Sequence, residues 1–230
     1  MASARQPDPG PERLPSGRHK LPREFVVRSQ RERMLDAIAT ECARQGFAAV
    51  TVADVVARAR VSRQAFYEQF RDKEDCFLAA YDAILGQFLG AVIAAYEQKQ
   101  LPWPERVRAA IQAILTFLAA EPAFTRMTFV EVLAAGPQAY ERYISAVRVI
   151  AALLDEGRTQ TPNGAQLPAR LSSALISGAA LAIREQVWAG RTEELQRLEP
   201  DLLYTTLGPF LGQHKALRTA RSTAQHQTAR

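Results

Sequence analysis

The sequence predicts an all-α protein of about nine helices, in which a small N-terminal three-helix bundle precedes a larger helical domain. Apolar residues recur at spacings of three and four along most of the chain, which is the period of a helix with one buried face. Capping hydroxyl residues, prolines and glycines separate these segments and mark where helices begin and end. No strand-like alternation and no internal repeat competes with this interpretation.

The composition is that of a globular protein with one or two domains. The chain has 230 residues, of which 47% are hydrophobic and 23% are charged. The two cysteines, Cys42 and Cys76, lie in apolar helical stripes, which favours buried thiols in a reducing cytoplasm over disulfides. The longest apolar run, 83–96, is too short for a membrane span, and the N-terminus lacks a signal segment. We therefore expect a cytoplasmic protein.

The first two helices are marked by capping boxes. Ser29, followed three residues later by Glu32, predicts the start of the first helix, and Gly46 is suited to end it. Thr51 and Asp54 form an acidic variant of the same signal and predict a second, shorter helix.

The third helix carries the strongest functional signal. Ser62 is placed to cap it, and Phe66 and Phe70 share a face that can anchor the helix to a core. Because only two residues separate it from the preceding helix, the pair predicts a helix-turn-helix, with a short surface helix of unrelated role as the alternative. Its opposite face carries donor-rich side chains that suit base edges and phosphate oxygens: Arg63, Gln64 and Tyr67.

A fourth, long helix is expected to begin after Asp72. The arrangement of three short helices and a long one resembles the TetR family of transcriptional regulators over residues 28–78. The likeness is carried by Gly46, Phe47, Thr51, Val52, Ala53, Asp54, Val55, Val61, Ser62, Phe66, Tyr67, Phe70, Lys73 and Glu74. The resemblance implies that the helix begun by Ser62 enters the major groove, and that Thr51, Tyr67 and Lys73 contact phosphates. The residues expected at the DNA are Arg28, Thr51, Ser62, Arg63, Gln64, Ala65, Tyr67 and Lys73.

Three residues depart from the usual pattern. Arg60 holds a turn position that is usually glycine, so a positive φ there would cost about 1 kcal/mol unless the turn differs, and the same turn could point Arg60 at a phosphate. Ala65 replaces a frequent threonine and leaves a methyl group that could touch a thymine. Glu68 would repel phosphates, and we expect it on the outer side, away from the groove.

The net charge supports DNA binding only weakly. The chain carries +5 and has a pI near 9.5. Between residues 25 and 75, however, nine basic and eight acidic residues leave only +1. The prediction of DNA binding therefore depends on where the charges point rather than on their sum.

The remaining helices are expected at about 73–98, 104–120, 122–136, 138–157, 168–189 and 193–211. The expected domains are a disordered N-terminal arm (1–24), a helix-turn-helix DNA-binding domain (25–71), a helical ligand-binding and dimerisation domain (72–213) and a disordered C-terminal tail (214–230). Basic residues of the arm could reach an adjacent groove, although a solvated tail is the default: Arg13, Arg18, Lys20 and Arg23.

A protein that recognises one half-site of a palindromic operator gains affinity when it forms a dimer, because the two copies bind both half-sites together. The helix at about 168–189 is rich in small residues and the helix at about 193–211 is rich in leucine, so both are candidates for the face of a homodimer. The resemblance implies the same seam. The alternative is that both helices belong to the core.

The fourth to eighth helices are expected to enclose a ligand cavity. The candidates to line it are Phe88, Trp103, Phe117, Phe124, Met127, Phe129, Glu131, Tyr143, Arg184 and Trp188. Aromatic residues at helical spacing are also typical of a packed core, so this set favours an apolar or aromatic ligand only weakly.

The sequence thus indicates a ligand-responsive transcriptional repressor, bound as a homodimer to a palindromic operator in double-stranded DNA and released by a small apolar or aromatic effector. No cofactor or metal is expected. An enzyme is disfavoured because His19, His214 and His226 lie in the terminal tails and neither cysteine has a histidine partner. A helical adaptor that uses its first domain for protein contacts is the other alternative, which salt-dependent binding to duplex DNA would exclude.

Overall fold

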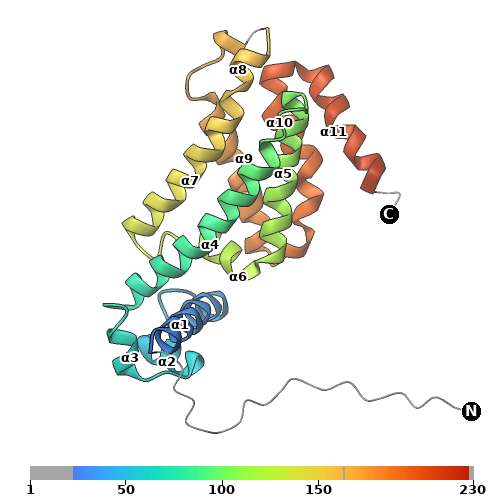
Figure 1. Ribbon diagram of the computed structural model, residues 1–230. Coiled ribbons are helices and arrows are strands. Elements are labelled where there is room, and N and C mark those ends of the chain that lie inside the picture. Colours follow the sequence, from blue (N-terminus) through green and yellow to red (C-terminus); the bar gives the residue numbers. More distant parts are fainter. Residues whose placement is uncertain (1–22, 163, 228–230) are drawn as a thin grey trace, which may run out of the picture.

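The computed structural model describes residues 23–162 and 164–227, and helices make up most of that part of the chain (Figure 1). We call α1 to α3 the head and the remaining elements the body. The head comprises α1 (Arg23–Gln45), α2 (Val52–Ala59) and α3 (Arg63–Tyr67). The body comprises α4 (Lys73–Tyr96), α5 (Trp103–Ala120), α6 (Pro122–Arg126), the π-helix η1 (Met127–Glu131), α7 (Pro137–Asp155), α8 (Gly157–Gln160), the 3-10 helix η2 (Gly164–Gln166), α9 (Leu171–Trp188), the 3-10 helix η3 (Thr192–Leu198), α10 (Glu199–Leu211) and α11 (Gln213–Gln227).

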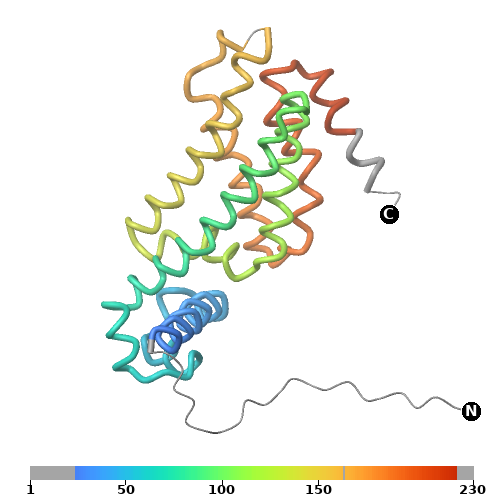
Figure 2. The backbone as a smooth tube through the Cα atoms, viewed as in Figure 1, coloured from blue at the N-terminus to red at the C-terminus, as the bar shows by residue number. Residues whose placement is uncertain are grey.

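Helix α4 connects the two parts. It leaves the head and runs through the body, where it packs against α5 on one side and α7 on the other (Figures 1 and 2). Helix α9 in turn packs on α7, and α10 packs on α5 and α9. By length and composition alone α4 could cross a membrane, although Gln87 interrupts its apolar run. Its buried side chains instead form part of one hydrophobic core that extends from the head into the body.

The all-helical prediction is confirmed, but several helix boundaries differ from those expected. Helix α1 begins at Arg23, and Ser29 lies inside it, because no proline or glycine between Arg23 and Gly46 interrupts helical propagation. The segment after Pro122 changes from α to π geometry at Met127, which sequence periodicity does not distinguish.

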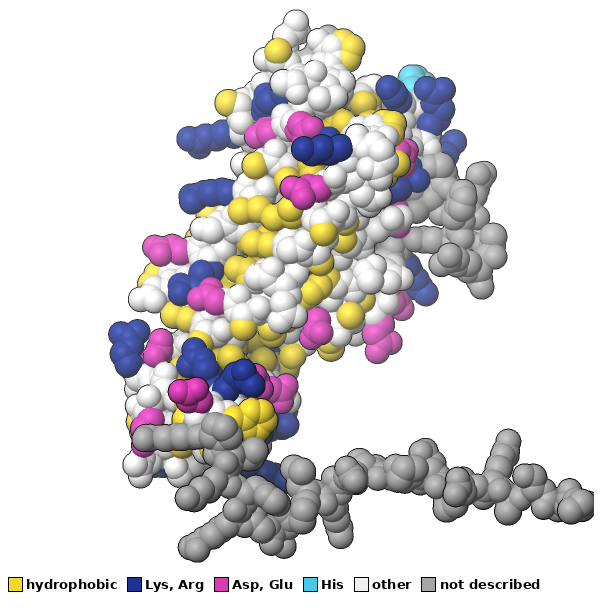
Figure 3. All heavy atoms as spheres, in the orientation of Figure 1, with side chains coloured by type: hydrophobic (Ala, Val, Ile, Leu, Met, Phe, Trp, Pro, Cys, Tyr) yellow, Lys and Arg dark blue, Asp and Glu magenta, His cyan; other side chains and the backbone are white. Residues whose placement is uncertain are grey.

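The C-terminal segment from residue 214 is not a disordered tail in the described part of the chain. Gly212 turns the backbone with φ +79°, and α11 then folds back along α10 (Figure 1). Ala216 and Ala220, one turn apart on α11, are buried. These two alanines and a hydrogen bond from Arg108 to Thr219 O dock α11 on the body, while Leu217 stays 38% exposed. Figure 3 shows apolar side chains as broken bands over the visible face of the body, with Lys and Arg gathered towards the head and near α11.

Candidate DNA interface and ligand cavity

The helix-turn-helix is fixed by local hydrogen bonds. Thr51 and Asp54 form the expected capping box: Thr51 N donates to Asp54 Oδ2 at 2.9 Å, and Asp54 N donates to Thr51 Oγ1 at 3.3 Å. The hydroxyl of Thr51 also donates to Asp54 Oδ2, at 2.7 Å, and this bond together with that from Thr51 N holds the pKa of Asp54 below its usual value. Ser62 caps α3 by accepting a hydrogen bond from Ala65 N at 3.1 Å. Both hydroxyl residues therefore orient helices before any DNA is present.

Of the two possibilities that the sequence left open at Arg60, the turn between the two helices has the left-handed conformation. Its φ and ψ are 54° and 49°, and among the described residues it alone has a positive φ without being glycine. Its amide N–H still closes the end of α2 on Ala57 O. The side chain of Arg60 is exposed at this corner.

Helix α3 presents a polar face and buries an apolar one. Arg63, Gln64 and Tyr67 are exposed, with 58% of Tyr67 accessible. Phe66 is fully buried, and its ring lies 5.5 Å from that of Phe70. The arrangement matches the expected division between an anchoring face and a reading face.

Two residues of α3 lie differently from expectation. Ala65 is only 9% exposed, so its methyl group belongs to the packed side of the helix and has little surface left for a thymine. Glu68 is one helical turn after Gln64 and accepts a hydrogen bond from its side-chain amide at 3.0 Å. Glu68 therefore lies on the same face of the helix as Gln64, and not on the side away from the groove. The Gln64 amide has to break its hydrogen bond to Glu68 before that donor can bind a base.

Lys73 has a structural role in the free protein. Its Nζ donates to Phe47 O at 3.0 Å, Val50 O at 2.9 Å and Ala48 O at 3.4 Å, and it lies 4.5 Å from the centre of the Phe47 ring. An ammonium group has three donors, and all three are directed at the loop between α1 and α2. The sequence resemblance implied a phosphate contact, which would require Lys73 to give up these carbonyls.

The remaining candidates lie on the surface of the head. Arg28 is exposed near the start of α1, with its guanidinium 5.6 Å from the ring centre of Phe25. Behind this surface Arg58 and Arg44 both pair with the carboxylate of Glu41, and they hold its pKa below the usual value. The single carboxylate offsets one of these two positive charges, so less of the head's positive charge is free than its arginine count indicates.

A junction of hydrogen bonds joins the head to the body. Glu131, at the end of η1, is 6% exposed and accepts a hydrogen bond from Phe47 N at 2.9 Å. Arg126 lies 3.4 Å from the same carboxylate. Gly46, next to this contact, has a φ of +82°, which glycine adopts without strain. Glu131, expected in the ligand cavity, thus contacts the head instead.

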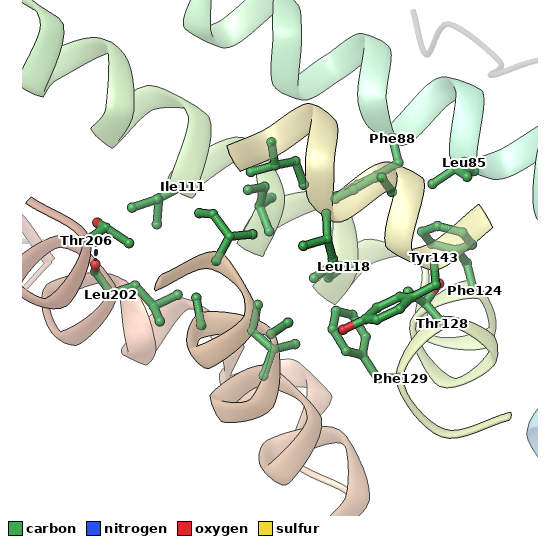
Figure 4. Close-up of a pocket in the computed structure, with 18 of the residues that line it drawn as sticks. Leu85, Phe88, Ile111, Leu118, Phe124, Thr128, Phe129, Tyr143, Leu202 and Thr206 are labelled. Carbon is green, nitrogen blue, oxygen red and sulfur yellow. Dashed lines mark hydrogen bonds between the residues drawn. The ribbon is translucent and has the colours of Figure 1, made fainter. Parts of the chain in front are cut away.

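The body encloses a cavity of about 70 Å³, which we call the central cavity (Figure 4). Four of the ten expected residues line it: Phe88, Phe124, Phe129 and Tyr143. The sequence analysis missed its aliphatic wall, which includes Leu85, Ile111, Ile114, Leu118, Val147, Ile150, Ile176, Ile183 and Leu202. Their helical spacing is the same as that of a filled core, so no sequence signal marked them.

Six expected residues do not line the cavity. Trp103 packs against Phe210 with ring centres 5.2 Å apart, and Phe117 stands behind Phe88 and Phe124. Met127 is fully buried elsewhere in the core, whereas Trp188 is 69% exposed on α9. Arg184 also lies outside the lining, as does Glu131 at the junction. Periodicity placed these residues on the correct helices but could not distinguish inner from outer faces.

A second cavity of about 30 Å³ continues the first. The two share Ile111, Ile114, Ile150, Ile176 and Thr206, so together they form an elongated apolar space between α4, α5, α7, α9 and α10. No residue that lines either cavity carries a charge within the described part of the chain.

Both thiols are buried and free. Burial raises the pKa of Cys42 and of Cys76 to about 12, so neither is a thiolate nucleophile. Within residues 23–162 and 164–227, no group of His, Cys, Asp and Glu has the arrangement of a metal site.

Comparison with known proteins agrees with this geometry. Residues 34–80 match the model of the bacterial regulatory proteins of the tetR family. No curated protein matches the chain. Among solved structures, the fatty acid degradation regulator FadR of Bacillus halodurans superposes with a TM-score of 0.67 at 19% identity, covering 77% of this chain and 93% of that one. FadR of Bacillus subtilis, in complex with stearoyl-CoA, gives 0.65 at 18% identity over 79% and 98%. A TetR-like regulator from Rhodococcus sp. RHA1 gives 0.61 at 21% identity over 84% and 100%.

The helix-turn-helix of α2 and α3 lies within the segment that matches the model of the tetR family of regulatory proteins. The family match covers residues 34–80, and over the rest of the chain the similarity to the solved regulators is one of fold.

Proposed function

We propose that this regulator binds a palindromic operator as a homodimer, represses transcription there, and leaves the DNA when a small apolar effector enters the central cavity. The observation that supports operator binding best is the exposed set Arg63, Gln64 and Tyr67, presented on a helix that Phe66 anchors. Its length and position suit insertion of α3 into a major groove. Residues 25–71 would form the DNA-binding domain and residues 72–213 the regulatory domain.

The homodimer would form through α9 and α10. One stripe of α9 is exposed at helical spacing and combines small residues with two large apolar ones and one acid: Ala174, Ser177, Gly178, Leu181, Glu185 and Trp188. Leu181 is 55% and Trp188 69% exposed, and Tyr204 on α10 is 39% exposed. Small residues let a second helix approach closely, and the large ones would gain burial in a partner of the same sequence. The buried free thiols agree with a cytoplasmic location.

The apolar lining of the cavity supports an uncharged, apolar effector. The Bacillus subtilis regulator of similar fold was solved with stearoyl-CoA, whose acyl chain is also apolar. An effector would act by a coupling free energy, because the walls of the cavity include α4 and η1, and both elements also contact the head. A shift of either element would change the spacing of the two recognition helices in the dimer.

Selection of bound duplexes from random DNA, combined with the mass of the complex, tests operator binding and dimerisation together. We expect an inverted repeat bound by two protomers, with affinity that falls steeply as salt rises. Arg63→Ala should change the preferred base, whereas Arg197→Ala, an exposed arginine of η3, should not. Selection of a single half-site by one protomer, or no selection, would contradict the proposal.

A matched pair of leucine variants tests the dimer face. Leu181→Glu should yield monomers in light scattering and weaken operator binding, because it places a charge in the seam. Leu133→Glu, at a leucine that is 57% exposed outside α9 and α10, should leave the dimer intact. Dimers that persist in Leu181→Glu would exclude this face.

A further inference from the structure

Two hydroxyl groups in the wall of the central cavity have no hydrogen-bond partner. They belong to Tyr81 on α4, which is fully buried, and to Thr128 on η1, which is 7% exposed. Neither Tyr81 Oη nor Thr128 Oγ1 makes a hydrogen bond with any described residue. Buried polar groups in folded proteins are paired as a rule, so two unpaired hydroxyls in one cavity wall require an explanation.

The two hydroxyls are neighbours. Burial raises the pKa of Tyr81 to about 12, and the nearby Thr128 hydroxyl opposes part of that rise. Within 3.5 Å, however, no hydrogen bond joins them. Figure 4 places Thr128 at the same end of the cavity as Phe124, Phe129 and Tyr143. This aromatic end therefore has free hydrogen-bonding capacity.

The opposite end of the cavity contains a hydroxyl that is satisfied. Thr206 Oγ1 donates to Leu202 O at 2.6 Å within α10, and Figure 4 shows both residues beside Ile111. The remaining wall at that end is aliphatic and continues into the second cavity. Polarity is thus confined to one end of an otherwise apolar space.

We propose that Tyr81 and Thr128 are the polar recognition element for the effector, which is a neutral molecule with a carbonyl or hydroxyl group at the aromatic end and an apolar remainder. This inference rests on the proposed effector role of the cavity. Each hydroxyl can donate one hydrogen bond and accept another. A single carbonyl or hydroxyl group placed between the two can therefore bond to both. A carboxylate does not fit, because it would lose its hydration where no lining residue carries a positive charge.

The position of the pair connects recognition with release. Tyr81 is on α4, whose N-terminal Lys73 donates to the loop that follows α1. Thr128 is on η1, whose last residue Glu131 accepts from Phe47 N in the same loop. A ligand group bonded to both hydroxyls would therefore bridge the two elements that hold this loop of the head.

A triad of probes of similar size and with the same number of heavy atoms tests the chemical class: acetophenone, cumene and benzoate. Calorimetric titration of the full-length protein should show that acetophenone binds roughly three- to tenfold more tightly than cumene, as expected for one net hydrogen bond, and that benzoate binds more weakly than acetophenone. Equal affinity for acetophenone and cumene, as when water keeps the hydroxyls occupied, would overturn the inference. Preference for benzoate, or no binding by any probe, would also overturn it.

Three isosteric variants identify the residues responsible. Tyr81→Phe and Thr128→Val should each reduce the preference for acetophenone over cumene, and the double variant should abolish it. Thr206→Val is the matched control, because it removes a lining hydroxyl that is already bonded, and it should keep the preference. Retention of the preference in the double variant would overturn the assignment.

Stability without a ligand gives an independent readout. Removal of an unpaired buried hydroxyl should leave the thermal midpoint unchanged or raise it, whereas Thr206→Val should lower it. A fall with Tyr81→Phe and Thr128→Val equal to that with Thr206→Val would show that both hydroxyls have internal partners. Operator binding is measured separately, so a protein that selects acetophenone but binds no duplex would contradict the proposed function and leave this inference standing.

Discussion

The head and the aromatic end of the central cavity differ in whether their polar groups are hydrogen-bonded within the protein. In the head, the hydroxyls of Thr51 and Ser62 cap helices, and the ammonium of Lys73, the first residue of α4, is bonded to three carbonyls of the loop after α1. In the cavity, the hydroxyls of Tyr81 and Thr128 are unpaired. A surface that reads DNA has to hold its geometry before the DNA arrives, whereas a site for an effector needs binding capacity that the protein itself has not used.

The same substitution in both regions should give the largest difference. Phe66→Ala removes a ring that is packed on all sides in the head and should lower the free energy of unfolding by about 3–5 kcal/mol. Phe88→Ala removes a ring from the cavity wall, where part of the surroundings is already empty, and should cost less. Urea unfolding followed by circular dichroism measures both.

Operator binding gives the second half of this comparison. Phe66→Ala should lose it, because α3 is no longer anchored, and Phe88→Ala should keep it. If Phe88→Ala were the more damaging of the two, the cavity wall would be more tightly packed than its empty space indicates.

A smaller effect separates the two roles considered for Lys73. Lys73→Met keeps the aliphatic stem and removes the donors to Phe47 O, Ala48 O and Val50 O, so the free energy of unfolding should fall by about 2 kcal/mol. The slope of operator affinity against salt should stay unchanged. A slope lower by about one unit, with stability intact, would instead show that Lys73 neutralises a phosphate.

Coupling between the two regions should depend on Glu131. Glu131→Ala removes the acceptor of Phe47 N and should reduce the coupling free energy, which is typically about 1–3 kcal/mol in such systems. It is measured by titrating acetophenone with and without operator DNA, since DNA and effector must weaken each other by the same factor. Glu141→Ala, at an exposed residue of α7, is the control. Unchanged coupling in Glu131→Ala would mean that the coupling runs through the other elements that contact α1, which include α4 and α6.

The head could be predicted from the sequence in more detail than the cavity. The capping residues of the head form hydrogen bonds to backbone groups within three residues of themselves, so their spacing in the sequence predicts their roles: Thr51, Asp54 and Ser62. Lys73 and Glu131 act on residues 26 and 84 positions away, and no local pattern reports such contacts. Local patterns also do not show which side chains leave space between them, because the packing of several helices together decides this. The aromatic Phe88 was therefore assigned to the cavity, whereas the aliphatic Ile176 was not.

The smallest expected effect concerns the turn of the helix-turn-helix. Arg60 adopts φ 54°, which an L-residue with a side chain occupies only at a cost, while glycine adopts it freely. Part of that gain is lost because glycine adds freedom to the unfolded chain, so Arg60→Gly should raise the free energy of unfolding by about 0.5–1 kcal/mol. Operator affinity then decides why an arginine stands here. If the variant is more stable and binds operator equally well, Arg60 makes no contact with DNA. If it is more stable but binds all duplexes more weakly, with a lower salt slope, the exposed guanidinium reaches a phosphate. In that case the strained turn serves to place the guanidinium at the DNA.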